Sequence, residues 1–201
     1  PEAIATLTWL VDAMRDRLIA PEIDRPDARR LFGQGAMAFY LDAPQARTFA
    51  RQFSGRDTEI DPAVRPMQGP VLAEGNTPVS LQWGHVLIAF GDDNATPDSA
   101  AMRFILHVLE DENLVGYAAQ QSTLPATQSG AAAPEITQDA YLSDWLAATV
   151  SPIPHTIAGL DQGAEVTTIV GEELQAAILG QKSPQDAADA MQQRLTALLG
   201  S

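Results

Sequence analysis

Apolar residues recur every three to four positions in several stretches of the chain, which is the spacing of a helix with one buried face. This pattern predicts helices over residues 3–18, 27–32, 45–53, 96–121, 136–150 and 163–179, and a last helix that begins at Ser183. Thr96 and Pro97 have the residue types of an N-cap and a first helical position. The helix after them is expected to bury the side chains of Ala101, Phe104, Ile105, Val108 and Leu109.

Two short runs, residues 36–41 (AMAFYL) and 86–90 (VLIAF), are apolar at nearly every position. Such a run is typical of a strand that is covered on both faces, so we predict two buried strands. Residues 55–78 contain many prolines and glycines and predict a crossing segment with short extended pieces. Residues 126–134 predict a mobile loop, and the prolines within residues 151–155 predict a kinked extended segment.

The predicted helices outnumber the predicted strands, so the fold class is a helix-rich α/β arrangement whose sheet is short of strands. The chain begins at Pro1, already within a helical pattern. We therefore expect it to be part of a longer protein, in which the missing strands would lie.

The charge of the chain is strongly acidic, with 26 acidic and 12 basic residues and a formal net charge of -14. Such a surface repels phosphate backbones and anionic lipid, which argues against nucleic-acid and membrane-surface binding. The chain has no cysteine, which excludes disulfides, thiolate metal sites and a cysteine nucleophile. No apolar run approaches the roughly 18 residues of a membrane span.

Residues with catalytic or metal-binding chemistry are few. His85, His107 and His155 lack neighbours at metal-ligand spacing, and no glycine-rich phosphate loop or serine nucleophile motif is present. We predict that the chain is not an enzyme and carries no cofactor or metal. Trp83 stands beside Gly84 at the start of a predicted strand, where a tryptophan either packs as a lid or stacks on a ligand.

The order of several segments resembles a known family. They are ATLTWLVDAM, LFGQGAMA with the following YLDAP, WGHVLIA, AAMRFILHVL, LPA and AAILG with the following SPQDAA. In this order they resemble the C-terminal half of extracellular solute-binding proteins of family 1. These proteins are the sugar-binding subunits of ABC importers and include maltose-binding protein.

The resemblance implies a periplasmic-binding-protein-like fold of type II, with two lobes that close on a ligand. Residues 1–82 and 135–201 would belong to the C-terminal lobe, and residues 83–134 would be an excursion into the N-terminal lobe. The crossings near Gln82 and Pro134 would be hinges. The implied function is binding of a small solute and its delivery to ABC permease subunits, in a periplasmic or extracellular location next to the transporter.

The resemblance also implies which residues line the ligand cleft. They are the turn Asp42-Ala43-Pro44-Gln45, the segment Trp83-Gly84-His85, and the start of the long helix around Gln162 to Thr167. Some family members have a stacking tryptophan where this chain has Gln45. A small polar ligand such as a monosaccharide, disaccharide, polyol or glycerol-phosphate type compound therefore fits better than a long oligosaccharide. Asp42 and His85 would bind hydroxyl groups, and Arg47 would meet an anionic group if its helix faces the cleft.

Two other readings of the sequence remain open. The chain could be an acidic helical domain that binds a protein partner, or an enzyme that reuses the binding-protein fold. The incomplete sheet also predicts exposed strand edges, and with them a dimer.

Overall fold

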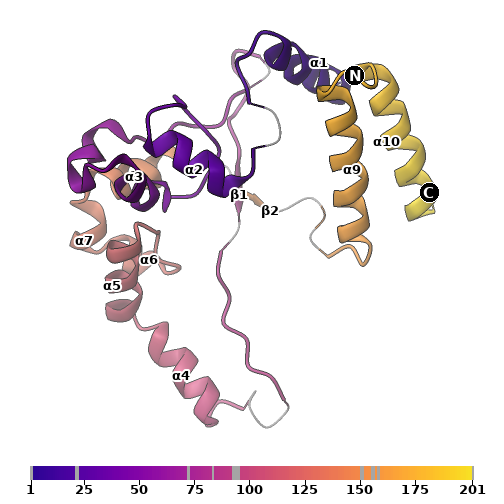
Figure 1. Cartoon of the computed structure of the whole chain (residues 1–201). Helices are drawn as coiled ribbons and strands as arrows, with labels where there is room; N and C mark the ends of the chain where they lie inside the picture. Colours follow the sequence, from indigo (N-terminus) through magenta and orange to yellow (C-terminus); the bar gives the residue numbers. More distant parts are fainter. Residues whose placement is uncertain are drawn as a thin grey trace. The chain divides into compact units, whose positions relative to one another are not determined.

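The computed structural model describes residues 2–20, 23–71, 73–82, 84–91, 96–149, 152–154, 157 and 159–200. The chain forms two compact units, which we describe one at a time (Figure 1). The terminal unit consists of Pro1–Ile23 and His155–Ser201, and the central unit consists of Asp24–Pro154.

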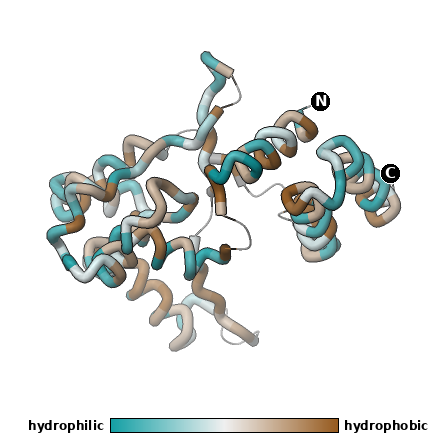
Figure 2. The backbone as a smooth tube through the Cα atoms, turned by 45° about the horizontal axis from the view of Figure 1, so that its top comes forward, coloured by the Kyte–Doolittle hydropathy of each residue, from teal (hydrophilic) through white to brown (hydrophobic). Residues whose placement is uncertain are grey.

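The terminal unit is built from three helices, α1 (Glu2–Arg15), α9 (Gly163–Ile178) and α10 (Pro184–Leu199), each of which contacts the other two. Its core consists of Leu7, Ala177 and Ala187, with Val11, Leu174, Ala188 and Met191 packed around them. Figure 2 shows hydrophilic and hydrophobic residues interleaved along these helices, as expected for helices with one buried face. The predicted cap at Ser183 is confirmed, because its side chain accepts from the Asp186 N–H at 3.0 Å.

The central unit contains α2 (Arg25–Gly33), α3 (Ala46–Ser54), the 3₁₀ helix η1 (Asp57–Ala63), α4 (Ala100–Val108), α5 (Asp111–Gln121), α6 (Gln128–Ala131), α7 (Pro134–Thr137) and α8 (Ala140–Ala148). One core joins side chains from distant parts of this unit: Ala50, Val64, Val115, Ala118, Ile136, Tyr141 and Leu142. Helices α2 and α3 approach closely at Gly33, where an added Cβ would lie 2.7 Å from the Cβ of Phe53. The predicted helices over 27–32 and 45–53 are confirmed as α2 and α3.

The described residues contain one small sheet, in which β1 (Ser80–Gln82) pairs in parallel with β2 (Pro152–Pro154). Leu81 is the partner of Ile153 in this register. The extended conformation predicted for residues 151–155 is thus confirmed for the part that the structure describes. The pairing also places Gln82, where a crossing between lobes was predicted, beside Pro154.

The prediction of buried strands over residues 36–41 and 86–90 is wrong. Neither run forms a strand, and each has several side chains that face solvent: Phe39 is 71% exposed, Leu41 87%, Val86 76% and Ile88 63%. A strand needs a neighbour for its backbone hydrogen bonds and a layer to cover its faces. Within the part of the chain that the structure describes, the sheet consists of β1 and β2, and neither run pairs with it.

The structure has two helices, α4 and α5, where the sequence predicts one over residues 96–121. The first of them also begins later than the predicted cap at Thr96. Ser99, not Thr96, is the N-cap of α4 and accepts from the Met102 N–H at 3.1 Å. The chain leaves the helical conformation at Glu110, which becomes the N-cap of α5. The expected buried face of α4 is also wrong, since Phe104 is 64% and Leu109 42% exposed.

The prediction of a mobile loop over residues 126–134 is wrong as well. Thr127 caps α6 by accepting from the Gly130 N–H at 3.1 Å, and Pro134 occupies the first turn of α7. Ile136 on α7 is fully buried and anchors this part of the chain in the core.

Candidate functional site

The turn at residues 42–45 lies between α2 and α3 and is held by an ion pair. The side chain of Asp42 is only 2% exposed. Its two carboxylate oxygens accept from Nε and Nη2 of Arg29 at 2.7 and 2.8 Å, and Oδ1 also accepts from the Ala43 N–H at 2.9 Å. The Arg29 guanidinium lies over the ring of Phe49 at 3.9 Å. Asp42 thus fixes the start of the turn.

The charge of Asp42 is stabilised despite its burial. Burial by itself would raise the pKa of this carboxyl, but the hydrogen bonds from Arg29 and the Ala43 N–H outweigh it, and the pKa is lowered. Burial and the same carboxylate raise the pKa of the neighbouring Tyr40 hydroxyl. Contact between Asp42 and a solute hydroxyl stays a prediction, and the solute would share the carboxylate with Arg29.

Gln45, at the end of the turn, is the N-cap of α3, and its side chain makes no capping hydrogen bond. Its Oε1 is buried and has no hydrogen-bond partner among the residues that the structure describes. A buried acceptor without a partner costs about 1–3 kcal/mol, so such an atom calls for an explanation. Gln45 is therefore a sequence-predicted site residue with an unused buried acceptor.

Arg47 and Tyr141 join this turn to the start of α8. The Tyr141 hydroxyl donates to the carbonyl of Pro44 at 2.7 Å and accepts from the Arg47 N–H at 3.2 Å. The Arg47 guanidinium, which is 4% exposed, donates to both oxygens of Asp139 at 2.8 Å and to Oγ of Ser122 at 3.0 Å. The charge of Arg47 is thus paired inside the protein, and the condition set for its contact with an anionic ligand is not met here.

A shallow depression of about 300 Å³ lies beside this network and is lined by Arg47, Asp61, Pro62, Arg65, Asp139, Ala140 and Tyr141. Its charges are largely paired: Arg51 binds Asp61 through two hydrogen bonds, and Arg47 binds Asp139. Burial alone would raise the pKa of Asp139, but the hydrogen bonds from Arg47 and the Leu142 N–H lower it. Paired charges of both signs make this a polar surface without excess charge.

The other predicted site residues belong to other segments of the chain or lie outside the described residues. Trp83 lies outside the described residues. Gly84 and His85 are exposed, and Gly84 has open space where a side chain would stand. Gln162 is exposed and is the N-cap of α9 in the terminal unit. Whether these residues meet around a ligand stays a prediction.

Sequence reasoning missed three residues of the site, Arg29, Asp139 and Tyr141. Asp139 carries a local signal, since an aspartate just before an apolar helix is a good N-cap, and it accepts from the Leu142 N–H at 3.0 Å. Arg29 and Tyr141 carry none, because their partners depend on how the helices pack.

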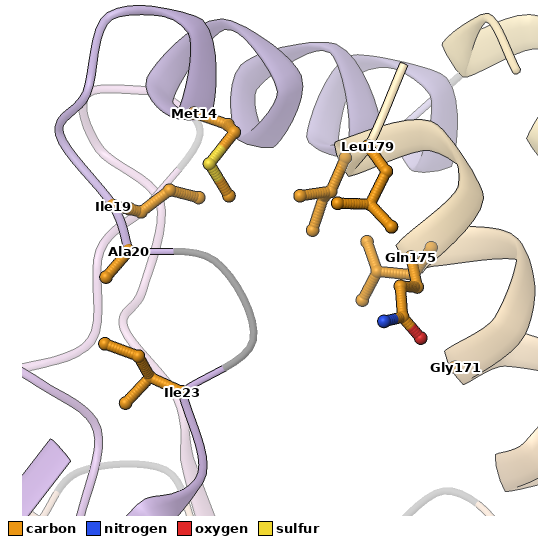
Figure 3. Close-up of a pocket in the computed structure, with 9 residues that line it drawn as sticks. Met14, Ile19, Ala20, Ile23, Gly171, Gln175 and Leu179 are labelled. Carbon is orange, nitrogen blue, oxygen red and sulfur yellow. The ribbon is translucent and has the colours of Figure 1, made fainter. Parts of the chain in front are cut away.

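A second depression, of about 240 Å³, belongs to the terminal unit. Figure 3 shows Met14, Ile19, Ile23 and Leu179 directed toward it from α1, the segment after α1, and the end of α9. Gln175 is the polar side chain among its lining residues. The depression is mostly apolar and is distinct in chemistry from the turn at residues 42–45.

Metal-binding and membrane-spanning features are not found within the described ranges. No group of three or more His, Asp or Glu side chains there has the arrangement to hold a metal ion. None of the helices in the same part of the chain has the length and apolarity to cross a bilayer.

A solute-binding class is indicated by a comparison with protein families. The family model described as bacterial extracellular solute-binding protein matches residues 1–143. Since this match covers well over half of the 201 residues, the chain belongs to that family. A comparison with curated proteins gave no match.

Membership of the family confirms the coarser part of the sequence-based expectation. The chain has a substrate-binding role in transport, its partners are a small solute and a transporter, and its place is extracellular or periplasmic. The helix-rich structure is compatible with part of a solute-binding protein.

Proposed function

We propose that the chain is the substrate-binding component of an ABC-type importer and that it binds a small carbohydrate or polyol. It releases the solute to membrane permease subunits and carries out no catalysis. Family membership supports the binding and transport roles. The resemblance of its ordered segments to sugar-binding proteins supports the solute class and the assignment to the C-terminal half of a two-lobed protein of type II.

The observation that supports this site is the Oε1 of Gln45, which is buried and has no hydrogen-bond partner among the described residues. A solute hydroxyl is a suitable donor for this oxygen. Asp42 and Arg29 hold one end of the same turn, and Tyr141 holds the other. The resemblance implies that Trp83, Gly84, His85 and Gln162 also line the cleft, and a tryptophan there is suited to stacking on the apolar face of a solute.

The pairing of the arginines near the turn supports an uncharged solute. Arg29, Arg47 and Arg51 each bind an aspartate within the protein. A phosphate or carboxylate on the solute would have to compete with these aspartates for the same guanidinium groups. We therefore expect neutral sugars and polyols to bind better than glycerol 3-phosphate.

A panel of single solutes tests the proposal on the full chain. Glucose, maltose, sorbitol and glycerol 3-phosphate are added one at a time while thermal unfolding is followed. A solute at 100 times its Kd stabilises the folded state by about 2.7 kcal/mol, which raises the Tm by several degrees. No change in Tm with any of the four at millimolar concentration contradicts the proposal.

A pair of glutamine variants locates the binding. Gln45→Ala is expected to reduce the shift caused by the solute, because it removes the free acceptor. Gln193→Ala, at an exposed position on α10, is the matched control and is expected to bind like the unchanged chain. Equal shifts for both variants would exclude a role of Gln45 in binding.

We also propose that the exposed extended residues 86–90 allow a dimer to form. Their exposed apolar side chains, those of Val86, Leu87, Ile88 and Phe90, are suited to burial against a second copy of the chain. Sedimentation of the full chain over a range of concentrations tests this, and a single monomeric species throughout would contradict it.

A further inference from the structure

The hydroxyl of Tyr141 binds the backbone on both sides of Gln45. It donates to the carbonyl of Pro44, the residue before Gln45, and accepts from the N–H of Arg47, two residues after it. The two hydrogen bonds, 2.7 and 3.2 Å long, span 97 and 94 residues of sequence. One side-chain atom on α8 therefore restrains the turn that carries the predicted solute contact.

The ring of Tyr141 is itself held in place. The Arg47 guanidinium covers the ring with its central carbon 4.5 Å from the ring centre, and the same guanidinium binds Asp139. Asp139 is the N-cap of α8, two residues before Tyr141. The contacts form a closed cycle from Arg47 through Asp139 and α8 to Tyr141 and back to Arg47, which leaves the hydroxyl little freedom to move.

The hydroxyl remains available as a donor over the physiological range. Tyr141 is 3% exposed, and burial raises the pKa of its hydroxyl to about 12. It therefore stays protonated at neutral pH. A phenylalanine would fill the same space, so the packing of the core does not require the hydroxyl oxygen. The hydroxyl is required for the hydrogen bonds to the backbone of the turn.

We infer that Tyr141 is a positioning residue of the solute-binding turn, because its hydroxyl fixes the backbone that presents Gln45. The inference rests on the proposed function, since the position of Gln45 matters for function when a solute binds there. A turn that is already in its binding conformation loses less conformational entropy on binding, and the affinity rises accordingly.

The experiment compares Tyr141→Phe with Tyr117→Phe in the full chain. Both variants lose one phenolic oxygen, but Tyr117 on α5 is 53% exposed and serves as the matched control. Amide hydrogen exchange of Ala46 and Arg47 is measured first, without solute. We expect exchange at these amides to become on the order of tenfold faster in Tyr141→Phe and to stay unchanged in Tyr117→Phe.

The second measurement is the affinity of each variant for those of glucose, maltose, sorbitol and glycerol 3-phosphate that bind the unchanged chain. We expect Tyr141→Phe to raise the dissociation constant by about fivefold to tenfold. The affinity is measured at a temperature at which both variants are fully folded. A purely structural role would lower the Tm and leave this affinity unchanged.

The outcomes separate the inference from the proposed function. Unchanged affinity in Tyr141→Phe overturns the inference and leaves the proposed function in place. Unchanged exchange at Ala46 and Arg47 also overturns it. If none of the four solutes binds the unchanged chain, the proposed function fails, and the inference fails with it even if exchange is faster.

A second variant keeps the test decisive if Tyr141→Phe does not fold. Asp139→Asn retains an oxygen for the Leu142 N–H but removes the charge that holds Arg47. It is expected to speed exchange at the same two amides and to weaken solute binding by a smaller factor. No effect on either quantity would overturn the inference.

Discussion

Two regions of the central unit are both rich in apolar residues and differ in what their side chains contact. Around α3, α5, α7 and α8, the side chains of Ile136 and Leu142 are fully buried in one core. In the stretch from residue 84 to residue 109, Val86, Ile88 and Phe104 are each more than 60% exposed. The same residue types thus lie in a core in one region and on a surface in the other.

The difference teaches that an apolar run becomes buried only where other elements of the chain cover it. Helices α3, α5, α7 and α8 meet around Ile136. The pair Arg47–Asp139 joins α3 to the start of α8, and the pair Arg51–Asp61 joins α3 to η1. Residues 84–91 form no helix or strand, and residues 100–108 form α4, none of whose residues is buried. A large exposed apolar surface of this kind is typical of an interaction site.

The largest expected effect comes from a matched pair of isoleucines. Ile136→Ala opens a cavity in the core and is expected to lower the free energy of unfolding by about 4 kcal/mol. Ile88→Ala, at a position 63% exposed, is expected to change it by less than about 0.5 kcal/mol. Urea denaturation of both variants measures this, and similar losses in the two would contradict the contrast between the regions.

A matched pair of arginines is expected to show the next largest effect. Arg47→Ala leaves Asp139 and Ser122 without their partner and is expected to cost about 3 kcal/mol of stability. Arg65→Ala breaks an exposed pair with Asp144, whose closest atoms are 3.9 Å apart, and is expected to cost less than about 0.5 kcal/mol. Chemical denaturation at low and high salt distinguishes them, because salt weakens only the exposed pair.

The stability of the central unit is expected to fall in acid. The folded pKa values of Asp42 and Asp139 lie below the ordinary value of about 4, so their contribution is fully present above that pH. It is lost as the pH falls from about 4 through the folded pKa values, because the unfolded chain binds protons first. Denaturation midpoints between pH 7 and pH 3 measure the loss, and Asp42→Asn is expected to flatten this dependence.

The smallest expected effect lies in the exposed region. Ser99→Ala removes the cap of α4 and is expected to destabilise this helix by about 1 kcal/mol. Because α4 has no buried residue, the loss should appear as faster amide exchange within residues 100–108, with little change in the global midpoint. An equal shift of the global midpoint would show that α4 is more tightly coupled to the core than its exposure indicates.

The sequence by itself determined the elements that depend on near neighbours. The helices α1, α2, α3, α9 and α10 follow from apolar spacing, and the cap at Ser183 follows from residue type, since these contacts join positions three or four apart. The turn at residues 42–45 was also predicted, and with it Asp42 and Gln45 as candidate site residues.

The tertiary structure decided which apolar runs are covered and which polar groups meet. Residues 36–41 and 86–90 have the composition of buried strands, but a strand is completed by neighbouring strands, which local sequence does not specify. The contacts of Tyr141 with Pro44 and Arg47 join positions more than 90 residues apart, and no local pattern encodes them. The way in which the turn is held was therefore visible only in the folded chain.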